Sequence, residues 1–244
     1  MNKIIVTGVW GQIGSAIVDL LTEAGNYVIG LDIKSDGKTS RTDLFEFHQI
    51  DITDQIRVRE FYSQLTLQHP QIDGLVNNAG TAVFTKFENR SEDEIMNVIR
   101  LNMMAPIFMS QKFLSVAKGN YKSSIVNIGS IYGVTAPDQK IYSDTPRNSS
   151  EIYGMTKAAI INLTQYLAVY LSDRKIRCNC VSPGGILFQQ GEEFVEAYSK
   201  KVPLGRMGSE REVAAAVCFL LDEKKSSYVN GANLMVDGGF TAWR

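Results

Sequence analysis

Short runs of apolar residues alternate with helical patterns along the whole chain. The runs cover residues 4–6, 27–31, 45–50, 75–76, 125–128, 176–181 and 234–236. Several of them are apolar at consecutive positions, which is typical of strands in a parallel sheet that is covered on both faces. The alternation predicts an α/β fold: a doubly wound parallel sheet of about seven strands, with helices on both faces and right-handed crossovers.

The helical patterns have recognisable ends. The helix between the first two strands carries an apolar stripe that ends at Gly25, and the stripe consists of Ile13, Ile17, Leu20, Leu21 and Ala24. Thr53 is the expected N-cap of the next helix. Ser91 and Glu94 form a capping box that predicts the start of a long third helix.

No linker, repeat or low-complexity tract divides the sequence. We therefore expect residues 1–244 to form a single domain that carries both a cofactor site and a substrate site. Residues 134–150 are rich in Pro, Asp, Ser and Asn, and this composition predicts a long surface loop.

Composition and charge exclude several classes of protein. The 25 Lys and Arg residues nearly balance the 26 Asp and Glu residues, so nothing favours binding to nucleic acid or to an anionic membrane. No apolar stretch is long enough to span a membrane, and the N-terminus does not resemble a signal peptide, so we expect a cytoplasmic protein. The three cysteines are expected to be buried core residues, and with only His48 and His69 in the chain we expect no metal site.

A glycine-rich turn follows the first strand and opens the first helix. Gly8 allows the tight turn, Gly11 lets the backbone approach a pyrophosphate, and Gly14 lets helix and strand pack closely. In this context the glycines predict a dinucleotide site, with the phosphates at the N-terminus of the helix. The alternative is a glycine-rich turn that binds no ligand.

Asp32 ends the second strand, 24 positions after Gly8. An acid at about this spacing binds the ribose 2′-hydroxyl of NAD, and its charge opposes the 2′-phosphate of NADP. The position favours NAD over NADP, although Lys34 is a nearby cation. The alternative is a solvated aspartate in a turn.

Four further motifs follow in order along the chain. They are Asn-Asn-Ala-Gly at 77–80, a strand that ends in Ser130, Tyr153-x-x-x-Lys157 at the start of a helical pattern, and Pro183-Gly184. On a helix, positions i and i+4 share a face, so the Lys157 ammonium is placed beside the Tyr153 phenol. In this order the motifs resemble those of the compact, single-domain branch of the short-chain dehydrogenase/reductase family, whose members have a Rossmann fold, and the resemblance covers nearly the whole chain.

The resemblance implies four catalytic residues. Tyr153 is the acid/base, Ser130 hydrogen-bonds the substrate oxygen, and Lys157 lowers the pKa of Tyr153 and holds the nicotinamide ribose. A phenol titrates near pH 10, so neutral activity requires a pKa about three units lower, and Lys157 and the oxidised nicotinamide are the two cations that can supply this shift. Asn102 would hold a water that relays protons to Lys157.

Pro106 supports the assignment of Asn102 independently of the resemblance. Proline has no N–H, so the helical hydrogen bond to the carbonyl of Asn102 is missing and the helix is expected to bend there. We expect the freed carbonyl to accept the relay water. The alternative is a proline-kinked helix with an incidental asparagine.

The resemblance also implies a set of cofactor contacts. Asp51 and Ile52 bracket the adenine; Asn78, Ala79 and Gly80 line the adenosine ribose; and Pro183 and Gly184 lie beside the nicotinamide. The set also includes Tyr153, Lys157 and the glycines of the turn. Its remaining members are Gln12, Ile13 and Ile186.

Two departures from the family pattern stand out. Gln12 occupies the position of the second glycine, so the glycine spacing resembles that of the extended branch, which includes epimerases and dehydratases; chain length and residues 77–80 favour the compact branch. The 23 residues from Ser130 to Tyr153 are also more than is common in the family. We expect the extra loop, 134–150, to border the substrate pocket together with residues 185–205, in which Glu192 begins a lid helix.

These observations lead to one principal hypothesis. The protein is expected to be an NAD-dependent oxidoreductase that transfers a hydride between nicotinamide and a carbonyl or secondary alcohol of a small, hydroxylated substrate such as a sugar or polyol. The polar pocket candidates behind the substrate class are Gln139, Tyr142, Gln189 and Gln190. Residues 184–186 and 203–207 resemble dehydrogenases of bacterial surface-carbohydrate and flagellin-modification pathways.

Two alternatives remain open: an epimerase or dehydratase with tightly held NAD, and a non-catalytic NAD-sensing protein. The resemblance also implies a homo-oligomer, a dimer or a tetramer built partly on the helix after Tyr153. Four residues of that helix could face either the core or a partner subunit: Ile160, Ile161, Leu163 and Tyr166.

Overall fold

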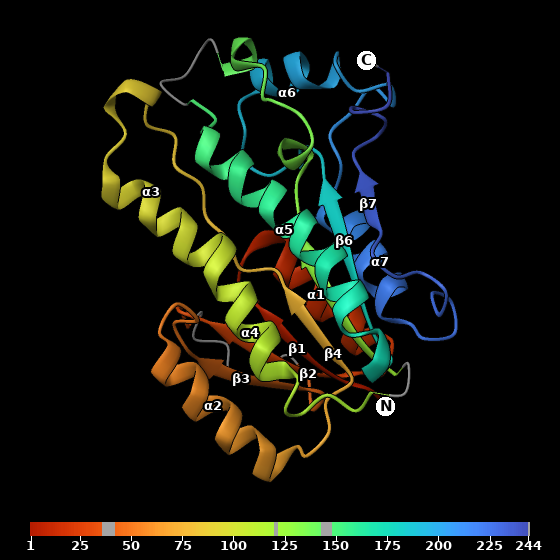
Figure 1. The fold of residues 1–244 in the computed structure, drawn as a ribbon. Helices are drawn as coiled ribbons and strands as arrows, with labels where there is room; N and C mark the ends of the chain where they lie inside the picture. Colours follow the sequence, from red (N-terminus) through yellow and green to blue (C-terminus); the bar gives the residue numbers. More distant parts are fainter. Residues whose placement is uncertain (36–41, 120–121, 143–147, 244) are drawn as a thin grey trace.

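Seven strands form one parallel sheet at the centre of the molecule, in the order β3-β2-β1-β4-β5-β6-β7 (Figure 1). The computed structural model describes residues 1–35, 42–119, 122–142 and 148–243. The strands are β1 (Lys3–Thr7), β2 (Tyr27–Asp32), β3 (Phe45–Gln49), β4 (Gly74–Asn77), β5 (Ser123–Ile128), β6 (Ile176–Pro183) and β7 (Asn233–Val236). Every apolar run singled out in the sequence overlaps one of these strands, and the predicted doubly wound sheet is confirmed.

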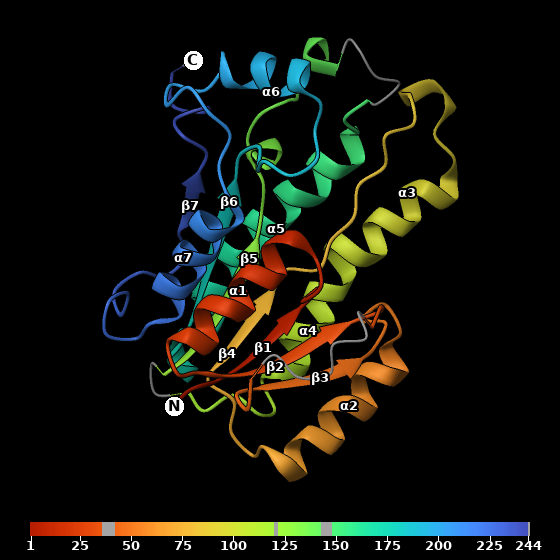
Figure 2. The same cartoon turned by 180° about the vertical axis from the view of Figure 1, so that it is seen from behind.

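Helices cover both faces of the sheet. They are α1 (Gln12–Glu23), α2 (Gln55–Gln68), α3 (Glu92–Ile99), α4 (Ala105–Phe113), α5 (Glu151–Tyr170), α6 (Glu192–Ser199) and α7 (Glu210–Leu221). The first and last of these, α1 and α7, pack against each other on one face, whereas α2, α4 and α5 cover the other (Figures 1 and 2). Short α6 lies apart from both layers, beyond the carboxyl ends of β6 and β7.

The sheet divides the apolar core in two. Along β1, Ile5 packs with the residues of α2, α4 and α5, whereas Ile4 and Val6 pack with those of α1 and α7. Successive strand residues point to opposite faces, so a central strand that is covered on both sides must be apolar throughout. All three side chains are at most 2% exposed, which accounts for the continuous run that the sequence shows.

The helix ends confirm one capping prediction and correct another. The Ser91 hydroxyl accepts from the Glu94 N–H while the Glu94 carboxylate accepts from the Ser91 N–H, as expected for a capping box. Thr53, however, does not cap α2. Its hydroxyl donates to Asp51, and the next residue, Asp54, accepts from the backbone N–H groups of the first turn instead.

The long helix around Pro106 is irregular, as its sequence predicts. Five residues between α3 and α4, Arg100–Met104, form a wider π-helical turn, and Pro106 follows as the second residue of α4. A π turn displaces one backbone group from the ordinary ladder, and such turns often occur at functional sites. It carries Asn102, whose side chain is buried.

The strand order reverses at β1. On one side of β1 the strands follow outward in the order β2, β3. On the other side they follow in the order β4, β5, β6, β7. Ligands of open α/β sheets bind in the crevice at such a switch point, beyond the carboxyl ends of the strands. The ends of β1, β4, β5 and β6 are therefore where a site is expected.

Several sequence expectations concern what lies outside this crevice. None of the helices in the described ranges has the length and apolar character needed to cross a membrane. Cys178 and Cys180 are buried in β6 and Cys218 is partly buried, and all three are free thiols. Within the described residues, His, Cys, Asp and Glu side chains form no group suited to a metal ion.

Candidate active site

The glycine turn after β1 is held in place by the loop after β4. Gly8 has a φ of +71°, a conformation that favours glycine, and a Cβ at Gly14 would lie 2.0 Å from the Gly8 carbonyl oxygen. The Asn78 side-chain amide donates to the carbonyls of Thr7 and Gly8 at 2.9 and 3.0 Å. Asn78 thus fixes the shape of the turn, and the close packing expected at Gly14 is present.

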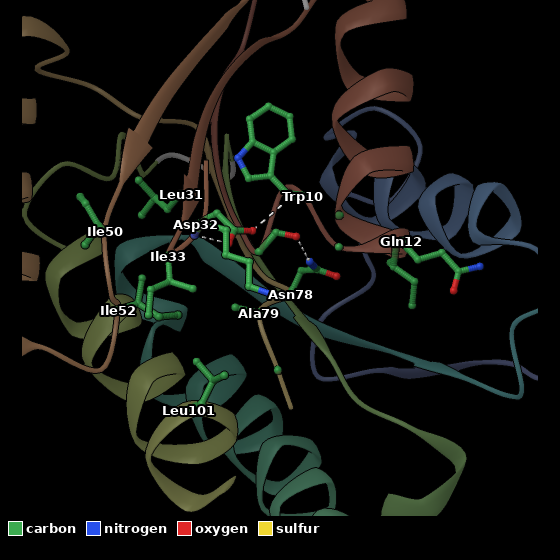
Figure 3. Close-up of a pocket in the computed structure, with 16 residues that line it drawn as sticks. Trp10, Gln12, Leu31, Asp32, Ile33, Ile50, Ile52, Asn78, Ala79 and Leu101 are labelled. Carbon is green, nitrogen blue, oxygen red and sulfur yellow. Dashed lines mark hydrogen bonds between the residues drawn. The ribbon is translucent and has the colours of Figure 1, made fainter. Parts of the chain in front are cut away.

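A cavity of about 470 Å³ opens between this turn and the ends of β2 and β4 (Figure 3). Most of the cofactor residues inferred from the sequence line it: Gly8, Gly11, Gln12, Ile13, Gly14, Asp32, Ile52, Asn78, Ala79 and Gly80. Asp51 lines neither this cavity nor the one that adjoins it. Its carboxylate accepts from the backbone and hydroxyl of Thr53 at 2.9 and 2.7 Å, so it shapes the turn before α2 instead of lining the cavity.

Asp32 lies at the far end of this cavity, away from Gln12 (Figure 3). One carboxylate oxygen accepts from the Trp10 N–H at 3.1 Å and the other from the Lys34 N–H at 3.0 Å. These two backbone bonds fix the orientation of the carboxylate. Each oxygen keeps a further lone pair that could accept from a ribose hydroxyl.

A second cavity, of about 390 Å³, continues from the first. Ile13, Asn78 and Gly80 line both, so together they form a trough across the carboxyl ends of the strands. Six residues inferred from the sequence line the second cavity: Ser130, Tyr153, Lys157, Pro183, Gly184 and Ile186. The trough therefore joins the Asp32 end to the expected catalytic residues.

Helix α5 places Tyr153 and Lys157 on one face, as their spacing predicts. Ser150 caps the helix by accepting from the Tyr153 N–H, which fixes the first turn. The Lys157 Nζ lies 5.6 Å from the centre of the Tyr153 ring and donates to the Ile128 carbonyl at 2.8 Å. The side chain of Ser130, just beyond β5, hydrogen-bonds Tyr153.

The pKa values of this pair differ from the sequence expectation. Burial raises the pKa of Tyr153, and the hydrogen bond with Ser130 only partly opposes this effect. Burial also lowers the pKa of Lys157 to about 8, so the ammonium form still predominates at pH 7. In the chain alone, the pKa of Tyr153 therefore stays above its ordinary value, because burial disfavours the phenolate.

Asn102 lies behind the trough and does not line it. Its side-chain oxygen accepts from the Thr81 N–H at 2.8 Å, and its amide donates to the Thr81 carbonyl at 2.8 Å and to the Thr156 hydroxyl at 3.3 Å. A Cβ at Gly80 would lie 3.4 Å from Asn102 Oδ1 and 3.6 Å from Lys157 Nζ, so these groups meet around Gly80. The side chain of Asn102 ties the loop after β4 to α5.

An outer cavity of about 200 Å³ lies above Ser130 and Tyr153, between the two segments expected to border the substrate. The rings of Tyr142 and Phe194 approach to 5.4 Å, and Lys201 pairs with Asp138 at 2.5 Å, so the 134–150 loop and the α6 region meet over the cavity. Residues 143–147 of the loop lie outside the described residues.

Two of the four polar pocket candidates line this cavity, Tyr142 and Gln190. Gln139 does not, because its side chain makes two hydrogen bonds with the backbone of Ser149. Gln189 does not line it either. Sequence analysis overlooked most of the apolar wall, whose members come from segments far apart in the chain: Phe84, Tyr132, Tyr198 and Met207.

The start of α5 is also held by a buried cation. The Arg90 side chain is 1% exposed; its guanidinium bonds the Glu151 carboxylate and the Thr85 carbonyl. Breaking such a pair leaves an uncompensated group and is more costly than the pair itself is stabilising. Arg90 thus connects the loop before α3 to the first turn of the helix that carries Tyr153.

We expect Arg90→Met to lower the free energy of unfolding by about 3 kcal/mol, or the thermal midpoint by about 6–12 °C. Arg57→Met is the matched control, because the Arg57 side chain is 66% exposed beside Asp54 and an exposed pair contributes about 0–1 kcal/mol. Thermal melts of both variants measure the difference. Equal midpoints in the two variants would show that the Arg90 pair does not hold this region.

Several known proteins are similar to this chain in sequence and in fold. A family model described as enoyl-(acyl carrier protein) reductase matches residues 8–241. An NAD-dependent glycerol dehydrogenase of Listeria innocua is 33% identical over 97% of this chain and 92% of its own length. The post-translational flagellin modification protein A of Campylobacter coli is 30% identical over 98% of each chain.

A solved structure agrees closely. A short-chain dehydrogenase of Leptospira borgpetersenii with bound NAD+ superposes with a TM-score of 0.92 and 41% identity, covering 98% of this chain and 92% of that one. The family match spans nearly the whole chain, and the relatives are named dehydrogenases and reductases. The chain therefore belongs to the short-chain dehydrogenase/reductase family, in its compact, single-domain form, and is an oxidoreductase of that family.

Proposed function

We propose that this protein is an NAD-dependent dehydrogenase that transfers a hydride between nicotinamide and a carbonyl or secondary alcohol of a small, uncharged polyol or sugar. The main support for this function is the continuous trough that runs from Asp32 to Ser130, Tyr153 and Lys157. One domain then carries both the cofactor site and the substrate site.

The side chains divide the chemistry among them. The bound cofactor supplies or accepts the hydride at the nicotinamide ring. Ser130 and Tyr153 hold the substrate oxygen by hydrogen bonds, and Tyr153 takes the hydroxyl proton during oxidation and returns it during reduction. Lys157, held by the Ile128 carbonyl, keeps a positive charge beside the Tyr153 ring and favours the phenolate.

Asp32 supports NAD as the cofactor, since its fixed carboxylate offers acceptors to a ribose diol and repels a phosphate. We expect Asp32→Ala to reduce kcat/KM with NAD by about 10–100-fold, the loss of one or two charge-assisted hydrogen bonds, and to leave the value with NADP unchanged or higher. Asp32→Asn is the matched control, because it keeps the shape and removes the charge. Steady-state kinetics with both cofactors measure the ratio, and an unchanged preference in both variants would count against this role of Asp32.

The outer cavity supports an uncharged, hydroxylated substrate. Its described lining carries no charged side chain, and its polar groups beyond Ser130 and Tyr153 are phenol hydroxyls and the Gln190 amide. Aromatic walls with neutral hydrogen-bonding groups suit a polyol or sugar, whose carbons contact rings while its hydroxyls bond the phenols. The named activity of the Listeria relative on glycerol supports the same class of substrate.

A substrate panel tests this proposal. Polyols, free sugars, sugar phosphates and nucleotide sugars are each supplied with NAD, and NADH formation is followed by absorbance. We expect turnover of polyols or sugars and at least tenfold lower kcat/KM for their phosphates, because the described lining of the outer cavity has no cation to pair with a phosphate. A clear preference for phosphorylated or nucleotide-linked substrates would overturn the assigned substrate class.

The exposed side of α5 supports a homo-oligomer. Ile160 is 2% exposed and Leu163 packs against the core, whereas Tyr166 is 60% exposed and stacks on Tyr170. The first two residues therefore face the core, and Tyr166 remains available to a second copy of the chain. Light scattering during gel filtration distinguishes a dimer or tetramer from a monomer.

A further inference from the structure

Gln12 makes contacts that a glycine at this position could not make. Its side-chain amide donates to the Leu187 carbonyl at 2.6 Å and to the Glu210 carboxylate at 3.1 Å. Figure 3 shows the side chain extending away from the Asp32 end of the cavity. The residue that departs from the family pattern thus connects the glycine turn to a segment 175 residues later in the chain.

The two connected segments both contribute to the walls of the trough. Ile13 on the glycine turn and Ile186 after β6 both line the second cavity. Gln12 and Leu187 are their immediate neighbours, so the hydrogen bond between them links one segment directly to the other. A ligand that lies along the trough from Asp32 to Lys157 would therefore contact both segments.

The far side of the Leu187 segment is anchored independently. The Leu187 N–H donates to the Gly208 carbonyl and the Gly208 N–H donates to the Gly185 carbonyl, both at 2.9 Å. This short pairing holds the segment to the chain before α7 by backbone hydrogen bonds that do not involve Gln12. Glu210, the first residue of α7, accepts a second hydrogen bond from the Gln12 amide.

We propose that Gln12 is a latch that holds the Leu187 segment against the glycine turn and slows the exchange of the dinucleotide. This inference rests on the proposed NAD-dependent function. Release of the dinucleotide requires the two segments to separate, and separation breaks the bond from Gln12 to Leu187. Gln12 is a positioning residue that acts through the Leu187 segment.

The test measures the dissociation rate of NADH by stopped-flow fluorescence. Gln12→Met keeps the length of the side chain and removes its donors, and Gln12→Gly restores the residue typical of the family. We expect both variants to release NADH about three- to tenfold faster, as suits the loss of one hydrogen bond of ordinary strength, with little change in the association rate. Glu210→Ala, which leaves the Leu187 bond in place, should change the rate by no more than about twofold.

A merely structural role of Gln12 would give a different result. If the residue only joined α1 to α7, Gln12→Met would lower the thermal midpoint of the cofactor-free protein and leave the NADH release rate unchanged. That outcome overturns the latch while the proposed function stands. If the unmodified protein binds no NADH, the proposed function and the latch both fail.

Discussion

Replacing Tyr153 with phenylalanine should reduce kcat/KM for alcohol oxidation by about 10²–10⁴-fold, the usual contribution of a positioned acid/base. Tyr153 lines the second cavity, where its hydroxyl hydrogen-bonds Ser130 and its ring centre lies 5.6 Å from Lys157 Nζ. Removing one oxygen leaves the ring and its packing in place, so we expect the dissociation constant for NADH to change by less than about twofold. Steady-state kinetics and fluorescence titration measure the two effects separately.

Tyr132→Phe is the matched control for that variant. Its hydroxyl lies in the same cavity, 3.4 Å from that of Tyr142, and burial raises the pKa of Tyr132 still further from neutrality. The Tyr132 hydroxyl is placed to bind substrate but not to transfer the proton. Its removal should therefore raise KM and leave kcat within about tenfold of the unmodified enzyme. If Tyr153→Phe retained more than about a tenth of the activity, another group would have to carry the proton.

Lys157→Met should reduce kcat/KM for oxidation at neutral pH by about 10²-fold or more, since the phenol then loses the cation that favours its ionised form. Loss of the ammonium should also change how activity depends on pH. Without the ammonium the pKa of Tyr153 lies higher, so activity in the variant should rise as the pH is raised, above the range in which the unmodified enzyme has levelled off. NADH affinity should also fall, because Lys157 lines the end of the trough that we propose holds the nicotinamide.

The double variant distinguishes a direct from an indirect role of Lys157. If Lys157 acts on the proton through Tyr153, then adding Lys157→Met to Tyr153→Phe should lower kcat by little more than Tyr153→Phe alone, because the effects of residues that act as a unit do not add. Full additivity of the two losses in kcat would instead indicate that Lys157 contributes to the chemistry by a separate route.

Helix caps and helix irregularities that depend on residues close together in the sequence were predictable. Ser91 and Glu94 satisfy each other's backbone groups across three residues, so the sequence alone specifies that cap. Pro106 removes a hydrogen bond from its own helix, so irregularity near Asn102 was predictable, although not that it takes the form of a π turn. At Thr53 two adjacent residues could both cap, and the carboxylate of Asp54 accepts the bonds because the Thr53 hydroxyl is engaged by Asp51.

The walls of the substrate cavity depend on contacts between distant segments. Phe84, Tyr132 and Met207 share no motif and no periodicity, and only the folded chain brings them together. The partner of Gln12 lies on another segment for the same reason. The pKa of Tyr153 is a further case: the i, i+4 spacing places Lys157 correctly, but the desolvation that raises the pKa depends on the complete packing around the phenol.

With the cofactor bound, we expect Lys157 to control the ionisation of Tyr153. The most direct measurement is an ultraviolet difference titration of tyrosinate between the unmodified protein and Tyr153→Phe, both saturated with NAD+, repeated in a Lys157→Met background. We expect the Tyr153 phenol to ionise at a clearly lower pH when Lys157 is present than in Lys157→Met, because the ammonium favours the phenolate. An identical titration of Tyr153 with and without the lysine would contradict the account.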